Sequence, residues 1–262
     1  ASNTSLTSIM TETLTADAEL LADGQLLTLA GTGAYTVTNL LADLTSTSTG
    51  TVGVTLDDDD LSSKNATITN NAASGALTVN SGSFDADDTI ALAGTQAVAV
   101  VATDSVAVTT GSANASVSEL TGKTATINAT SMSDGRTLSL SGAGNFTVTG
   151  LQADLSSSAD GGTLNVTTAN VATQTLALGS GANGTRTVNA NAMADGGKLT
   201  LTGDGALTLS VASADVYAAT YGGALTATIS NTGDSSIETG TGVTSITVTG
   251  NRTLTIDADA GT

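Results

Sequence analysis

The sequence predicts an all-β protein wound as a parallel β-solenoid, and three observations lead to this prediction. Apolar residues alternate with Thr, Ser or Asn in short runs such as Phe146–Thr149, a pattern typical of half-buried strands. No stretch keeps helical spacing for three turns, and the runs end at Gly, Asn, Asp or Ser residues that favour turns. The third observation is an internal repeat.

Four segments of the chain share one pattern, an L-x-L or similar strand followed by Gly, a second strand and an acidic turn. They are residues 23–44, 88–106, 134–155 and 195–216. The glycines that follow the first strand are Gly31, Gly94, Gly142 and Gly203, so two intervals of about sixty residues flank a shorter one. We therefore expect one repetitive region over 1–262, with repeats of about sixty residues at roughly 11–75, 76–123, 124–184 and 185–250 and a partial repeat at 251–262.

Two all-β architectures fit such a repeat. Tandem β-sandwich repeats are the alternative, but a sandwich domain needs roughly a hundred residues and commonly a large buried aromatic residue. A solenoid with coils of roughly twenty residues would place three coils in each repeat and, over thirteen coils, form a rod of about 60 Å. Its narrow interior suits small aliphatic side chains. Equivalent repeat positions hold only apolar residues, which predicts that they face inward: Tyr35, Val98, Phe146 and Leu207.

Composition excludes several classes of function. The chain has 262 residues, 24 of them acidic and 6 basic, for a net charge of −18, and it contains no His or Cys. It therefore lacks a thiol nucleophile, an imidazole base and the usual zinc ligands, and we expect no enzyme activity. So few basic residues make nucleic acid a poor partner, whereas divalent cations are plausible partners. The sequence contains no run of eighteen apolar residues, so we predict no transmembrane segment.

One acidic cluster predicts a calcium site. Four adjacent aspartates either repel one another in solvent or are held by a cation, and three further aspartates follow about one coil later. The candidate ligands are Asp57, Asp58, Asp59, Asp60, Asp85, Asp87 and Asp88. A solvated loop is the alternative interpretation of the same residues.

Other recurrent residues are better explained by structure than by chemistry. Asp43, Asp154 and Asp215 recur in the pattern A-D-[LV], and we expect them to cap turns through their own backbone amides rather than to form a column of calcium ligands. The G-x-G pairs precede strands rather than helices, which predicts turns and not phosphate loops. Outward T-x-T pairs could bind ice if they formed flat arrays, but interleaved Ser and Asn break the pattern. Three arginines lie at scattered repeat positions, and no acidic residue recurs beside them in the sequence to suggest a catalytic site: Arg136, Arg186 and Arg252.

The residues from Leu138 to Thr168, with their counterparts, resemble the β-strand repeat regions of giant RTX-type bacterial surface proteins. This class comprises S-layer proteins and adhesins exported by type I secretion. The resemblance covers nearly the whole chain. It implies an extracellular structural module at the bacterial cell surface, self-associating end to end or in a lattice, with calcium as a possible stabilising ion.

Members of that class often carry a calcium-binding element of the form G-S-G-x-D-T-I. Here the position of its Asp holds Asn183, Asn114 or Thr244. An amide or hydroxyl oxygen carries no charge, so these elements predict weak or lost calcium sites. The sequence as a whole predicts a structural module of an S-layer, adhesin stalk or matrix filament; the alternative is a ligand-binding module for glycan or ice.

Overall fold

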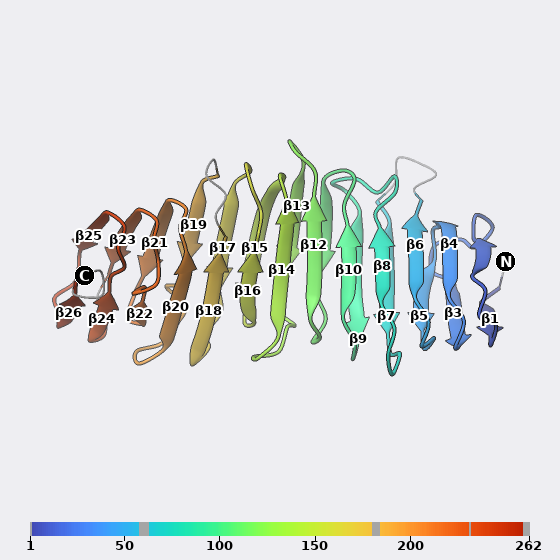
Figure 1. Ribbon diagram of the computed structural model, residues 1–262, viewed down its shortest axis with the longest axis horizontal. Helices are drawn as coiled ribbons and strands as arrows, with labels where there is room; N and C mark the ends of the chain where they lie inside the picture. Colours follow the sequence, from blue (N-terminus) through green and yellow to red (C-terminus); the bar gives the residue numbers. More distant parts are fainter. Residues whose placement is uncertain (1, 58–62, 180–183, 231, 259–262) are drawn as a thin grey trace.

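The computed structural model describes residues 2–57, 63–179, 184–230 and 232–258. They form one elongated stack of coils (Figure 1). Each coil contributes one strand to each of two parallel sheets. The described residues form strands and turns, and they include no helix that is long and apolar enough to cross a membrane. The all-β solenoid that the sequence predicts is confirmed, and the parallel pairing is incompatible with sandwiches of antiparallel hairpins.

The strands alternate between the two sheets along the chain, and each sheet has thirteen strands. One sheet, called sheet A, contains the odd-numbered strands: β1 (Thr4–Ser8), β3 (Leu26–Gly31), β5 (Asp43–Ser46), β7 (Asn65–Asn70), β9 (Thr89–Gly94), β11 (Val106–Thr109), β13 (Thr124–Asn128), β15 (Asn145–Leu151), β17 (Leu164–Thr168), β19 (Arg186–Asn189), β21 (Leu207–Val211), β23 (Leu225–Ile229) and β25 (Thr244–Val248).

Sheet B contains the even-numbered strands: β2 (Leu14–Asp17), β4 (Tyr35–Leu40), β6 (Val52–Leu56), β8 (Leu77–Asn80), β10 (Val98–Val101), β12 (Ala115–Glu119), β14 (Thr137–Gly142), β16 (Asp154–Ser157), β18 (Thr173–Leu178), β20 (Lys198–Gly203), β22 (Asp215–Tyr217), β24 (Ser235–Glu238) and β26 (Leu254–Asp257).

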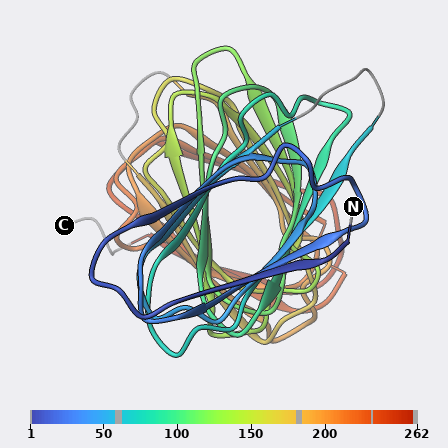
Figure 2. The same ribbon diagram turned by 90° about the vertical axis from the view of Figure 1, so that its right-hand side faces the viewer.

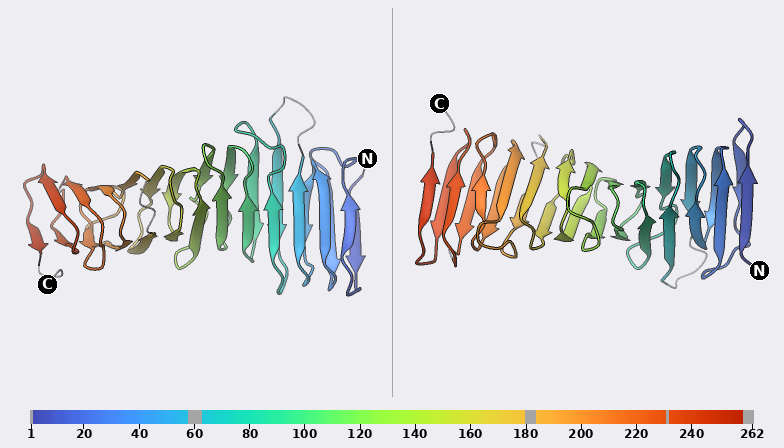
Figure 3. Two further views of the ribbon diagram at one scale, coloured as in Figure 1. Left: turned by 45° about the horizontal axis from the view of Figure 1, so that its top comes forward. Right: turned by 90° about the horizontal axis from the view of Figure 1, so that it is seen from below.

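The structural repeat is a single coil of about 21 residues, not the sequence unit of about sixty. Coil length varies because the turns vary. The coil that leads from Val98 to its ladder partner Ala115 is short, whereas the coil that leads from Val52 to its partner Leu77 is long. About 12 such coils make up the stack. Figure 3 shows that the first and last strands lie at opposite ends, and the view along the axis shows that the strands rotate progressively from coil to coil (Figure 2).

The core is one continuous column of apolar, mostly aliphatic side chains between the two sheets. Strand residues alternate between buried and partly exposed positions, as in the buried-exposed pattern of Leu207–Val211. The four residues expected to face inward are all buried: Tyr35, Val98, Phe146 and Leu207. They do not form a single column, however, because Tyr35 and Val98 belong to sheet B, whereas Phe146 and Leu207 belong to sheet A.

This division shows that related segments of the sequence lie on opposite sheets. The L-x-L strands that end at Gly31 and Gly94 are β3 and β9 of sheet A, and those that end at Gly142 and Gly203 are β14 and β20 of sheet B. Each of the two longer intervals between these glycines therefore corresponds to three coils. The shorter interval, from Gly94 to Gly142, runs from β9 to β14 and corresponds to two and a half coils. The repeated segment of the sequence can therefore begin on either sheet.

Candidate functional site

The predicted calcium site falls partly outside the described residues, since Asp58, Asp59 and Asp60 belong to the undescribed segment 58–62. The structure does bring Asp57 close to the later aspartates. Ser83, one coil further on, donates its hydroxyl hydrogen to Oδ1 of Asp57 at 2.8 Å. This contact links the turn after β6 to the turn that carries Asp85, Asp87 and Asp88.

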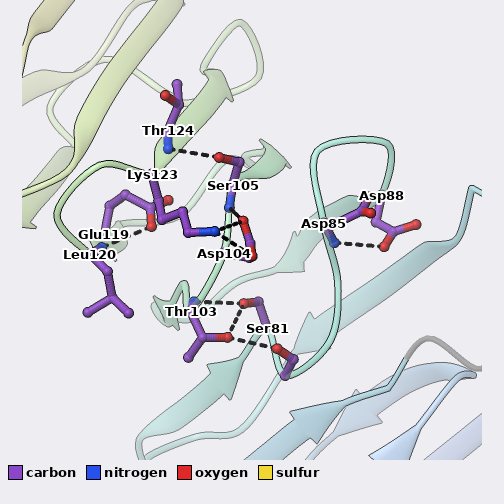
Figure 4. A network of polar contacts seen from close by, with 11 residues as sticks. Ser81, Asp85, Asp88, Thr103, Asp104, Ser105, Glu119, Leu120, Lys123 and Thr124 are labelled. Atoms are coloured by element: carbon purple, nitrogen blue, oxygen red, sulfur yellow. Dashed lines mark hydrogen bonds and ion pairs between the residues drawn. The ribbon is translucent and has the colours of Figure 1, made fainter.

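The three later aspartates form a turn whose carboxylates bind backbone amides. Asp88 is 1% exposed, and its two oxygens accept hydrogen bonds from the amides of Lys64 at 2.7 Å and Asp85 at 2.9 Å. Figure 4 shows the bond from the Asp85 amide. Asp85 Oδ1 in turn accepts the amide of Asp87 at 2.9 Å. Within the described ranges, no group of three or more Asp, Glu, His or Cys residues is placed to hold a metal ion. A calcium site built from these residues stays a prediction.

The aspartates of the A-D-[LV] pattern bind the next coil rather than their own turn. Oδ1 of Asp43 accepts the amide of Thr67, Oδ1 of Asp154 that of Thr175, and Oδ1 of Asp215 that of Ser236, each at 2.7 Å. The expectation that these residues cap their own turns was therefore wrong about the partner. The donor lies 21 to 24 residues away in sequence, and only the stacking of the coils brings it close.

The same contact recurs along the stack, and we call it the inter-coil clasp: a side-chain oxygen near a strand start accepts a backbone amide of the following coil. Further clasps are formed by Asn3, Ser105, Asn114, Asn145 and Asp234. Asn114, one of the residues found at the aspartate position of the calcium element, thus binds the amide of Thr137. Asn183 lies outside the described residues, and Thr244 begins β25 and donates to the carbonyl of Gly242 at 3.3 Å.

The G-x-G pairs are corners at which adjacent coils nearly touch, as the turn interpretation predicts. Gly142 has φ of 93°, and a Cβ there would lie 2.2 Å from the carbonyl oxygen of Glu119 in the preceding coil. A Cβ on Gly144 would lie 2.2 Å from Cγ of Glu119. The first glycine thus allows the backbones to approach, and the second leaves room for an inward side chain.

Glu119 is a functional candidate that the sequence reasoning missed. It ends β12 in the inward-facing series Ala115, Val117, Glu119, and it is 2% exposed. The alternation of the strand is the signal that could have found it. Nearby, Lys123 Nζ lies 2.7 Å from both carboxylate oxygens of Asp104, and this hydrogen-bonded ion pair holds the pKa of Asp104 below its usual value (Figure 4).

The outer faces carry shallow depressions and polar columns. A depression of about 310 Å³ on sheet B is lined by uncharged residues, including Thr78, Gln96 and Ser116. Another, of about 290 Å³, brings Tyr217 beside Glu238 and Asp257, with Lys198 stacked 4.1 Å from the centre of the Tyr217 ring.

On sheet A, seven successive coils place only hydroxyl or amide side chains in one outward column: Thr126, Thr147, Asn165, Thr187, Thr208, Thr226 and Ser245. The expected interruption by Ser and Asn occurs at two positions, and the column continues through both. The face that carries it is twisted rather than flat (Figure 2).

Comparison with protein-family models, with curated proteins and with solved structures finds no match to this chain.

Proposed function

We propose that this protein is a rigid structural module of an extracellular bacterial surface protein, in an S-layer, an adhesin stalk or a matrix filament. The observation that carries the proposal is the uninterrupted pairing of all thirteen strands in both sheets. Bending such a stack must stretch backbone hydrogen bonds on one side, and inter-coil clasps add further bonds in the same direction. The bacterial origin and the cell-surface location rest on the resemblance to RTX-type surface proteins.

Force spectroscopy with handles at the two ends tests the mechanical role. A module that carries load should resist extension and then release one coil at a time. A coil of about 21 residues should add roughly 70 Å of chain per step, since an extended residue spans about 3.3–3.6 Å. Smooth extension at low force without discrete steps, as in a flexible linker, would refute the proposal.

Self-association end to end is the second part of the proposal. Of the eight exposed large apolar side chains among the described residues, six lie in the first or last coils: Ile9, Met10, Leu20, Val243, Val248 and Ile256. Val248 and Ile256 continue inward columns through Ile229 and Ile237, which are buried. A hollow of about 250 Å³ at the other end is lined by Leu6, Leu20, Leu21 and Leu27, among others. The last coil of one copy would therefore cover the first coil of another.

Sedimentation and electron microscopy over a range of concentrations test this association. We expect end-to-end oligomers of the wild-type chain, and loss of them in the double variant Val248→Thr/Ile256→Thr. The matched control is Val101→Thr, which removes an exposed apolar side chain from the middle of the stack. A wild-type chain that stays monomeric at all concentrations would contradict end-to-end association.

Calcium stabilisation is the third part, supported by the contact between Asp57 and the turn of Asp85–Asp88. Calcium should raise the melting temperature relative to chelator, and Asp85→Asn/Asp87→Asn should reduce that difference, whereas Asp160→Asn, in an exposed turn, should not. Equal melting temperatures in calcium and in chelator would show that calcium does not stabilise the protein.

The polar column on sheet A favours a second candidate, binding to a repetitive lattice such as ice. Successive side chains are spaced by the strand separation of about 4.8 Å. Thermal hysteresis measurements test this candidate, with Thr187→Tyr placing a bulky side chain in the middle of the column. Hysteresis that the variant abolishes would support ice binding, and its absence in the wild type would eliminate it. The twist of the face makes us favour the structural role.

A further inference from the structure

A buried carboxylate interrupts the aliphatic core at one corner of the stack. Glu119 lies beneath the corner formed by Gly142, Ala143 and Gly144, and its side chain occupies the room that Gly144 leaves by having no Cβ. Its partner in the ladder, Gly142, belongs to the following coil. The Glu119 side chain therefore forms part of the contact between two successive coils.

Only one of the two carboxylate oxygens of Glu119 is hydrogen-bonded. Oε1 accepts the amide of Leu120 at 2.9 Å, whereas Oε2 is buried with no hydrogen-bond partner among the described residues. Asp88, the comparable buried acid, has an amide on each oxygen. A buried ionised carboxylate without full hydrogen bonding is costly, and protonation removes that cost.

Two charged groups act on Glu119, and they already bind each other. Burial is the main cause that raises the pKa of Glu119; the Leu120 amide lowers it, the negative charge of Asp104 raises it and Lys123 lowers it. Lys123 forms its ion pair with Asp104. The Gly142–Gly144 corner and strand β10 (Val98–Val101), which pack against this region, contain no titratable residue.

The same corner is poorly covered on its outer side. Val101 and Leu120 are 39% and 54% exposed, and they are the two exposed large apolar side chains, among the described residues, outside the end coils. Val101 pairs with Ser118, immediately before Glu119. The backbone after Glu119 leads directly into the turn 120–123, so a movement of Glu119 would displace that turn.

We propose that Glu119 is a pH-dependent fastener between two coils: protonated, it stays beneath the Gly142–Gly144 corner, and ionised, it leaves the core and loosens the turn 120–123. Because the pKa is raised in the folded protein, the stabilising contribution is complete below about pH 4.5, the ordinary value. This stabilising contribution is lost as the pH rises through the raised pKa of Glu119 in the folded protein. This device does not depend on the biological role of the module.

The first test compares Glu119→Gln with the wild type in thermal unfolding at about pH 4 and about pH 8. Gln keeps the shape but cannot ionise, so the variant should melt higher than the wild type at the upper pH, and the difference should vanish at the lower pH. The matched control is Glu238→Gln, since Glu238 also ends a sheet B strand but lies partly exposed. It should show no such pH-dependent difference. An equal difference at both pH values for Glu119→Gln, or none at either, would overturn the proposal.

Hydrogen exchange locates the effect. Relative to the intrinsic rates, amides of residues 120–123 and 142–144 should exchange several-fold faster in the wild type at about pH 8 than at about pH 4. In Glu119→Gln, the protection of these amides should be the same at the two pH values. Uniform change along the whole chain would contradict a local fastener.

Gly144→Ala checks the position of the side chain independently. The added methyl would lie 2.2 Å from Cγ of Glu119, 2.7 Å from its Cβ and 2.6 Å from the carbonyl oxygen of Leu120. It should therefore destabilise both backgrounds, but the wild type more than a Glu119→Ala variant, which lacks Cγ. Equal destabilisation in the two backgrounds would show that Glu119 does not occupy this corner.

Discussion

The segments 23–44 and 134–155 have the same local structure on opposite sheets. Each has an L-x-L strand, a G-x-G corner, a second strand with a register shift near its end, and an aspartate clasp. In the first segment these elements run from sheet A to B and back, and in the second from B to A and back. The local structure of each segment therefore follows from its own sequence, and the place of the segment in the stack decides which residues it contacts.

The two segments differ in what they contact. The corner of the first covers Ser8 and that of the second covers Glu119. Tyr35 donates its hydroxyl hydrogen to the carbonyl of Ala30 at 2.5 Å, whereas Phe146, its counterpart, has no hydroxyl. At the register shift the first segment has Asn39 with φ of 56°, and the second has a glycine. These differences show which parts of the repeated segment are fixed and which can vary.

The largest expected effect comes from the corner that both segments share. Gly31→Ala combines a φ of 99° with a Cβ placed 2.0 Å from the carbonyl oxygen of Ser8. Strain of about 1–3 kcal/mol and overpacking of about 1–3 kcal/mol predict a loss of about 2–6 kcal/mol in the free energy of unfolding. Gly24→Ala is the control, with φ of 74° but no atom within 4 Å of the new Cβ, and should cost only about 1–2 kcal/mol. Similar losses by chemical denaturation would show that the coils do not approach at this corner.

The clasps should have the next largest effect. Asp154→Ala removes the acceptor for the Thr175 amide and should lower the free energy of unfolding by about 1.5–3 kcal/mol, the range for a hydrogen bond to a charged group. Faster exchange at Thr175, measured by NMR, would identify the lost contact. Asp160→Ala removes a nearby exposed aspartate and should change stability little. If both variants lost the same stability, the effect would be one of net charge and not of the clasp.

A smaller effect is expected where the two segments differ in the core. Tyr35→Phe makes the first segment like the second and removes a buried hydrogen bond, which predicts a loss of about 0.5–1.5 kcal/mol. Tyr217→Phe, on the outer face, is the control and should be nearly neutral. Calorimetry of both variants measures the two losses of stability. An unchanged melting temperature for Tyr35→Phe would show that the hydroxyl does not stabilise the fold.

The smallest effect is expected at the register shift. Asn39→Gly relieves the cost of a positive φ but removes the bond from Asn39 Nδ2 to Asp17 at 3.1 Å. The two changes oppose each other, so the free energy of unfolding should change by no more than about 0.5 kcal/mol. A larger loss in urea unfolding would mean that the Asn39–Asp17 bond holds the first two coils together.

The sequence predicts the strands and the inward positions because both follow from a period of two, which is local. The period of two does not reveal that related segments begin on opposite sheets, since strands of sheets A and B have the same alternation. The shorter interval between Gly94 and Gly142 was the available signal, because it does not correspond to a whole number of coils. The clasps could not be predicted, since Asp154 and its donor Thr175 are brought together only by stacking. Glu119 was missed because a charged residue at the end of a strand usually belongs to the turn.

Disulfide formation between paired cysteines tests the stacking of coils most directly, since the chain has no cysteine of its own. Thr126 and Thr147 are in-register neighbours on sheet A, whereas Thr147 and Ser156 lie on different sheets although they are close in sequence. We expect Thr126→Cys/Thr147→Cys to form an intramolecular disulfide readily, because adjacent strands lie within bonding reach. Thr147→Cys/Ser156→Cys should remain reduced. A disulfide in the second pair and none in the first would indicate antiparallel hairpins and contradict the solenoid.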